Sequence, residues 1–288
     1  MAIAAKAGIT GSQACSSENQ LVWPVFMLAG VLVLKKMLSK VFPSEKLSAP
    51  AALNTVHRQV SISDDSGDTT SNSLLPIKKA GKEIASKLFL AMSTEKGIHL
   101  ESLLSALGAL AGYACQISVR EAYVVQLARP EKEVFIVVHS KQNGDTYYFG
   151  DLLNRPLAES RYSIWSLASG ATQKLGLQQL IDLHEIFKHV TDTLGGADFG
   201  VPRIGSAHQA KETPLNYVIF LWPKLFPLAQ SFCKNPADWP VAFGVAIQEI
   251  LYASKDLIAP DLALKIVMES AVPMSKIYLP PQATSSSK

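Results

Sequence analysis

The chain has 288 residues, a formal net charge of +3 at pH 7, 48% hydrophobic residues and 18% charged residues. This composition excludes a disordered chain, which is poor in apolar residues, and a polytopic membrane protein, which needs several long apolar spans. Residues 1–60 hold six basic and two acidic side chains and so carry +4, which leaves −1 for the remainder. That remainder lacks the concentrated basic face of a nucleic-acid-binding protein, and we predict no nucleic-acid partner.

The three cysteines, Cys15, Cys115 and Cys233, are far apart in the sequence. An odd number at such spacings gives neither a disulfide framework nor a pair of metal ligands. Cys115 and Cys233 lie in apolar segments with helical periodicity, where a free thiol behaves as a small hydrophobic side chain. We therefore expect buried, reduced thiols, which fits a reducing compartment.

The N-terminal region combines a polar tail with a hydrophobic segment. Residues 1–20 are small and polar and are predicted to be disordered, whereas Leu21–Leu34 contains no charged residue. This run is shorter than the ~20 residues that cross a hydrocarbon core, but the stems of Lys35 and Lys36 can snorkel and extend it to residue 38. We interpret residues 21–38 as a single-pass membrane anchor. A cleaved signal peptide, a helix buried in the domain and a helix lying in the interface are the alternatives.

The lysines around this segment predict its orientation. Lys35, Lys36, Lys40 and Lys46 follow it, and only Lys6 precedes it. The positive-inside rule then places the C-terminal part of the chain in the cytoplasm.

A linker is predicted over residues 39–77. This stretch is rich in Ser, Asp, Thr, Ala and Pro and has no apolar periodicity. It cannot bury enough apolar surface to offset its chain entropy. We expect a flexible connection to a globular domain at residues 78–277.

The first part of this domain is predicted to be helical. Apolar residues recur at helical spacing over Lys79–Met92 and again over Leu100–Ala114. The second segment contains Gly108 and Gly112, a spacing that in a membrane favours helix dimers. Because its uninterrupted apolar run is too short to span a bilayer, we interpret it as a closely packed core helix.

A small antiparallel sheet is predicted near the middle of the chain. Glu133–His139 and Thr146–Phe149 are rich in β-branched and aromatic residues, and Asn143 and Gly144 between them favour a hairpin turn. Because an isolated hairpin is only marginally stable, we expect a third strand, supplied by Ile117–Leu127.

The rest of the chain is predicted to form helices and a disordered C-terminal tail at residues 278–288. Gly195 and Gly196 suit a helix C-cap, Asp238 suits an N-cap, and Pro223 and Pro227 predict a kink or a break. The predicted helices cover Tyr162–Leu175, Leu177–Leu194, Asn216–Cys233, Asp238 to about Ser254, and Pro260 to about Ser270. The fold class is therefore α+β, mostly α, preceded by one hydrophobic helix and a disordered linker.

One segment resembles a zinc-protease motif without matching it. His184, Glu185 and His189 would need the second histidine one position earlier, where Lys188 stands. Five helical residues rotate the side chain by ~140°, so the two imidazoles do not converge on one metal. We predict no metal and no cofactor, and we expect Glu185 and His189 to form an i,i+4 surface pair.

Catalytic motifs are equally weak elsewhere. Cys115 with His139 or His189 as a base would be a cysteine nucleophile, but such a thiol needs a partly exposed setting that favours the thiolate. The sequence contains no GxSxG elbow and no phosphate-binding GK[ST] motif. We predict no catalytic residues.

The long stretch Gly195–Gln209 is the candidate binding site. Long loops inside compact domains are often functional, and this one carries Asp198, Phe199, Arg203 and His208. Together these side chains can hold an anion or a peptide. The alternative is a structural crossover between helices.

Two functions remain open from the sequence. We favour a membrane-tethered, non-enzymatic module on the cytoplasmic side that binds a protein partner, with the aromatic stretch Tyr217–Leu228 either a core helix or an interaction patch. The rival is a hydrolase-like enzyme with its site near Gly195–Gln209 or Cys115. A closed pocket with converging polar groups would favour the enzyme, and an apolar groove the binding module.

Overall fold

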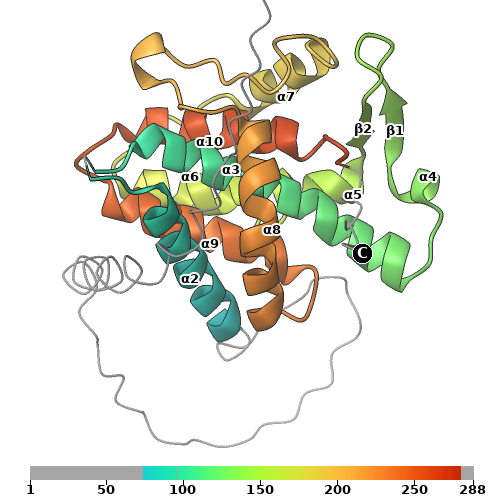
Figure 1. Cartoon of the computed structure of the whole chain (residues 1–288), viewed down its shortest axis with the longest axis horizontal. Helices are drawn as coiled ribbons and strands as arrows, with labels where there is room; N and C mark the ends of the chain where they lie inside the picture. Colours follow the sequence, from blue (N-terminus) through green and yellow to red (C-terminus); the bar gives the residue numbers. More distant parts are fainter. Residues whose placement is uncertain (1–73, 96, 280–288) are drawn as a thin grey trace, which may run out of the picture. The chain divides into compact units, whose positions relative to one another are not determined.

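The computed structural model describes residues 74–95 and 97–279, which are mainly helical (Figure 1). The long helices are α2 (Leu74–Met92), α3 (Leu100–Val119), α6 (Ile164–Lys174), α7 (Leu183–Asp192), α8 (Pro214–Phe232), α9 (Asp238–Ala253) and α10 (Pro260–Met274). The short elements are α4 (Glu131–Val134), α5 (Asp151–Asn154), the π-helices η1 (Arg120–Gln126) and η2 (Arg155–Glu159), the 3₁₀-helix η3 (Ser206–His208), and strands β1 (Ile136–His139) and β2 (Thr146–Phe149).

The predicted domain limits differ slightly from these elements. The predicted tail 1–20, the anchor 21–38 and most of the linker 39–77 lie outside the described residues. Helix α2 begins at Leu74, four residues before the predicted start of the domain. At the other end, Tyr278 still bonds to the sheet, since its N–H donates to the Thr146 carbonyl at 3.1 Å.

Helix α3 is the centre of the domain, packed against α8, α9 and α10. Together with η1 it is the one described helix long and apolar enough to cross a membrane, but 94% of its apolar window is buried inside the protein. A helix that is apolar all round belongs in a core, and the interpretation of this segment as a core helix is confirmed.

The glycines of α3 allow α10 to approach closely. A Cβ on Gly108 would lie 2.3 Å from the Val267 carbonyl oxygen, and one on Gly112 would lie 2.0 Å from that of Ala271. No real side chain fits at these distances. The spacing of the two glycines therefore serves helix packing inside the domain, as predicted.

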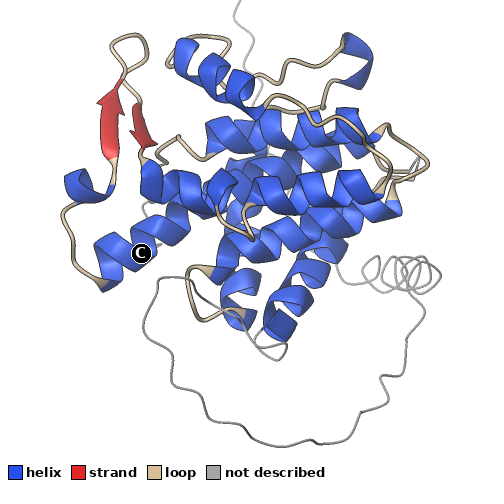
Figure 2. Ribbon diagram, turned by 180° about the vertical axis from the view of Figure 1, so that it is seen from behind, coloured by secondary structure: helices blue, strands red, loops and turns tan. Residues whose placement is uncertain are grey.

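The sheet is an antiparallel hairpin that lies at one end of the helical body (Figure 2). Its register pairs Ile136 with Phe149 and His139 with Thr146. The turn is longer than a two-residue hairpin loop, because Ser140 N–H donates to the Asp145 carbonyl at 2.9 Å. β1 begins three residues later than predicted, since α4 occupies the preceding segment.

The prediction of a third strand at Ile117–Leu127 is wrong. This segment ends α3 and continues as η1, where Tyr123 and Val124 pack against the core. The helix continues from α3 into this segment, and packing against the core outweighs the β propensity of its residues. The chain after α10 extends the hairpin instead, with Tyr148 N–H donating to the Lys276 carbonyl at 2.7 Å.

Several predicted helix ends also move. α7 starts only after Asp182, whose carboxylate accepts from two backbone N–H groups of the first turn. It ends at Asp192 with Thr193 as its C-cap, so the predicted C-cap at Gly195 lies two residues too far along the chain. Asp238 is the first residue of α9 rather than its N-cap, which is Ala237. α10 runs on to Met274.

Candidate functional site

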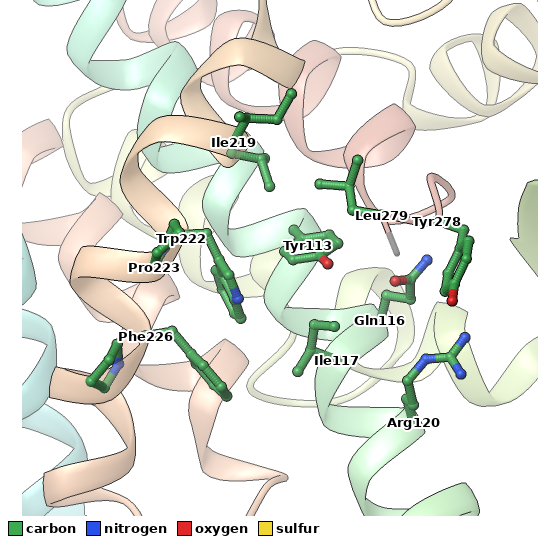
Figure 3. A pocket seen from close by; sticks show the side chains of 12 residues that line it. Tyr113, Gln116, Ile117, Arg120, Ile219, Trp222, Pro223, Phe226, Tyr278 and Leu279 are labelled. Carbon is green, nitrogen blue, oxygen red and sulfur yellow. The ribbon is translucent and has the colours of Figure 1, made fainter. Parts of the chain in front are cut away.

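A groove lies between the C-terminal half of α3 and α8, and the residues after α10 form its third wall (Figure 3). Its volume is about 640 Å³. Its twelve lining residues are mostly apolar or aromatic: Tyr113, Gln116, Ile117, Arg120, Val218, Ile219, Trp222, Pro223, Phe226, Pro227, Tyr278 and Leu279.

The α8 wall consists of aromatic rings held by one another. Trp222 stacks on Phe226 with ring centroids 4.4 Å apart, and Tyr113 of α3 meets the Trp222 ring edge-on at 4.9 Å. Trp222 also stacks on the buried ring of Phe243. These contacts fix the rings before any ligand binds.

Two prolines complete this wall. Pro223 and Pro227 lie inside α8, four residues apart and therefore on one face. Since proline has no N–H, the carbonyls of Ile219 and Pro223 lack their usual donor four residues on. The helix is nevertheless continuous from Pro214 to Phe232, so α8 is not split, and both prolines line the groove.

Arg120 is the one charged residue among those that line the groove. Its guanidinium lies 4.9 Å from the ring centroid of Tyr148, 5.4 Å from that of Tyr278 and 5.5 Å from that of Phe135. Its Nη2 donates to Glu131 Oε1 at 2.6 Å. Burial alone would lower the pKa of Arg120, but the interactions of the guanidinium with Glu131 and with the Tyr148 hydroxyl outweigh burial and raise it. The cation is therefore permanent.

Arg120 also opens the π-helix η1. π-Helical turns within α-helices are frequent at functional sites. On α8, Phe220 is 61% exposed and follows the lining residue Ile219 in the sequence, but it does not itself line the groove.

The other polar groups in the groove are of limited chemical use. Gln116 Nε2 donates to the Ile277 carbonyl at 2.7 Å, which fixes the amide. Burial raises the pKa of Tyr113 to about 12, so its hydroxyl stays protonated. The lining includes no Asp, Glu, His, Cys, Ser or Lys, so it offers neither a nucleophile with a base nor an acid–base pair.

The predicted site residue Arg203 is engaged by two carboxylates. Its Nη2 lies 2.8 Å from Glu269 Oε1, and its Nη1 lies 3.0 Å from Glu185 Oε1. The Glu269 side chain is only 2% exposed, so Arg203 balances a buried negative charge. The expected pair of Glu185 with His189 is replaced by this contact.

The other predicted residues are attached to separate parts of the domain. His208 Nδ1 lies 2.9 Å from Glu101 Oε1 near the start of α3, and the Phe199 ring packs edge-on against Tyr147 of β2. The Asp198 carbonyl accepts from Val201 N–H within the loop. These contacts do not bring the four side chains to one point, and binding at this loop stays a prediction.

Cys115 and Lys276 are two buried reactive groups that interact electrostatically. Cys115 is fully buried, and burial raises the pKa of its thiol. Lys276 is 1% exposed, and its Nζ donates to Asn154 Oδ1 at 3.0 Å. Burial lowers the pKa of Lys276 to about 8. The sequence around Lys276 carries no signal that distinguishes it from a surface lysine.

Comparison with models of known protein families, with curated proteins and with solved structures found no match to this chain.

Proposed function

We propose that this protein is a non-enzymatic interaction module that binds a segment of a protein partner in the groove between α3 and α8. The observation that carries the proposal is a preformed apolar groove with a single charged residue in its lining. Aromatic side chains in fixed rotamers bind with a small entropic cost, which is why they dominate interface hot spots.

The state of the reactive side chains supports a binding role over the rival enzyme. The fully buried Cys115 has a raised pKa and so remains a thiol, whereas a nucleophilic cysteine needs an accessible thiolate. Arg203, in the loop proposed as the alternative site, is paired with Glu185 and Glu269. An arginine that balances a buried carboxylate is costly to divert to a ligand.

We further propose that residues 21–38 tether the domain to a membrane with the domain on the cytoplasmic side. The support is the uncharged run Leu21–Leu34 and the four lysines that follow it against the one that precedes it. Fractionation of the full chain and of a version starting at Ser39 tests the tether. Equal solubility of the two would remove it.

The groove is tested by selecting a display library of 14-residue helical peptides against the full-length protein in lipid nanodiscs. Ile219→Ser should weaken binding of the enriched peptides at least fivefold, because Ile219 lines the groove. Phe220→Ser is the matched control, since Phe220 is adjacent on α8 and exposed but does not line the groove. Equal binding by both variants and the wild type would overturn the proposal.

A further inference from the structure

We infer that the occupant of the groove is an amphipathic α-helix that places apolar side chains against the α8 wall and one carboxylate against Arg120. This inference rests on the proposed function and specifies the chemistry of its partner. It follows from the length of the groove, its charge and the way in which Arg120 is held.

The length of the groove suits two turns of helix. Its lining extends from Tyr113 to Arg120 on α3 and from Val218 to Pro227 on α8. At ~1.5 Å per residue these distances are ~10 Å and ~14 Å. Side chains at i, i+3 or i+4, and i+7 of a bound helix cover the same length. A volume of about 640 Å³ accommodates such a row of side chains, with the helix backbone lying outside the groove.

The charge of the groove determines which charge a bound helix should carry where it contacts Arg120. Arg120 is the one charged lining residue, and no lining residue is acidic. A cationic side chain would therefore enter an apolar site beside a permanent cation. A carboxylate would gain a charge-assisted hydrogen bond. Figure 3 shows Arg120, Gln116 and Tyr278 on one side and Trp222 and Phe226 on the other, so the polar contact belongs to one edge of the bound helix.

The pairing of Arg120 with Glu131 leaves donors for a second carboxylate. A guanidinium has five N–H donors. The hydrogen bond to Glu131 engages Nη2, and the Tyr148 hydroxyl accepts a second one. The Glu131 side chain is 39% exposed and so is solvated, whereas that of Arg120 is 22% exposed. The rings of Phe135, Tyr148 and Tyr278 hold the guanidinium in place. A ligand therefore meets an oriented cation without having to order it.

The test compares the peptides selected by the wild type with those selected by Arg120→Gln, both full-length and in nanodiscs. The wild type should enrich helices with apolar residues at i, i+4 and i+7 and with Asp or Glu one turn beyond. Replacing that acidic residue by its amide should weaken binding to the wild type about tenfold and binding to Arg120→Gln less than twofold.

A second variant guards against loss of folding. The double change Arg120→Glu with Glu131→Arg keeps an ion pair and reverses the charge beside the groove, and it should enrich Lys or Arg at the same peptide position. Circular dichroism confirms the helical content of each variant before selection. If neither variant shifts the preferred charge, the assignment of Arg120 is overturned.

The outcomes separate this inference from the proposed function. Enrichment that depends on Ile219 but shows no acidic preference overturns the inference and leaves the groove as a binding site. Enrichment independent of Ile219 overturns both. If no helical peptide is enriched while dodecanoate binds in an Ile219-dependent manner, the occupant is a small amphiphile and the assignment of a helix is wrong.

Discussion

The two sides of helix α3 meet their neighbours in opposite ways. Toward α10 the backbones approach so closely that a Cβ on Gly112 would lie 2.0 Å from a carbonyl oxygen. Toward α8 the C-terminal half of α3 borders a groove of about 640 Å³. One core helix thus has a closed side and an open side.

The difference follows from the size of the side chains on each side. The α10 side has glycines and serines, and Ser105 Oγ lies 3.0 Å from Ser270 Oγ. The α8 side has Trp222, Phe226 and prolines. Small residues allow two helix backbones to approach each other and gain dispersion contacts. Large rings that pack on one another leave space between the helices. We expect changes on the closed side to alter stability and changes on the open side to alter binding.

Arg203→Ala should have the largest effect, because it leaves the buried Glu269 carboxylate without its partner. We expect a loss of about 4 kcal/mol in the free energy of unfolding, measured by urea denaturation. Glu185→Ala is the control, since Glu185 is 66% exposed, and it should cost less than about 1 kcal/mol. Adding Glu269→Gln to Arg203→Ala should restore part of the loss, and equal losses in both single variants would contradict the assignment.

Lys276→Met should change the pH dependence of stability. The pKa of Lys276 is about 8 in the folded protein against 10.5 for a free lysine, so the unfolded chain binds more protons between these pH values. Wild-type stability therefore gains from this residue as pH rises from 8 to 10.5, and that gain is lost again as the pH falls from 10.5 to 8. The advantage of the methionine variant over the wild type should shrink by about 3 kcal/mol over this range.

This difference is measured by denaturation of both proteins at pH 7, 8, 9 and 10.5. The difference in the free energy of unfolding between the two proteins at each pH cancels the titration of the tyrosines and cysteines that they share. Parallel pH curves would show that Lys276 keeps an ordinary pKa in the folded state.

Gly112→Ala should cost about 2 kcal/mol, because the added methyl group forces α3 and α10 apart. Gly170→Ala is the matched control in helix α6, where a Cβ meets nothing within 4 Å. It should stabilise the protein by up to about 1 kcal/mol. Thermal unfolding of both variants checks the contrast, and a shift of the same sign in both would undermine the close contact.

Ile219→Ser on the open side should have the smallest effect on stability, about 1 kcal/mol or less, because Ile219 is only partly buried. Phe220→Ser, at an exposed position, should be close to neutral. Chemical denaturation of the two variants measures these differences. A loss of several kcal/mol for Ile219→Ser would mean that the groove is part of the core.

The sequence predicted the elements whose signal is local. Gly108 and Gly112 indicated close packing because their spacing is helical, and Thr146–Phe149 forms a strand with the predicted bounds. The third strand was misplaced because β-branched residues at Ile117–Leu127 are also compatible with a helix that continues from the core. β2 pairs with β1 on one edge, and the segment that bonds to its other edge follows α10, more than a hundred residues away in sequence. No local pattern indicates that second contact.

The groove was only partly predictable. The aromatic stretch Tyr217–Leu228 was recognised as a core helix or an interaction patch, and the helix faces the core with Tyr217 and Leu225 and the groove with Trp222. Arg120 was not recognised, since its function depends on rings at positions 135, 148 and 278 that only the fold brings together. For the same reason the sequence suggested that Arg203 is available to bind an anion, because only the fold shows its pairing with Glu185 and Glu269.

The position of Leu279 has a practical consequence for experiments. Tyr278 and Leu279 form a wall of the groove. A reporter protein joined to the chain directly after Leu279 would therefore stand beside the groove and would compete sterically with a partner. An epitope inserted at Gly144, in the hairpin turn where a Cβ meets nothing within 4 Å, labels the domain while leaving the groove-lining residues unchanged.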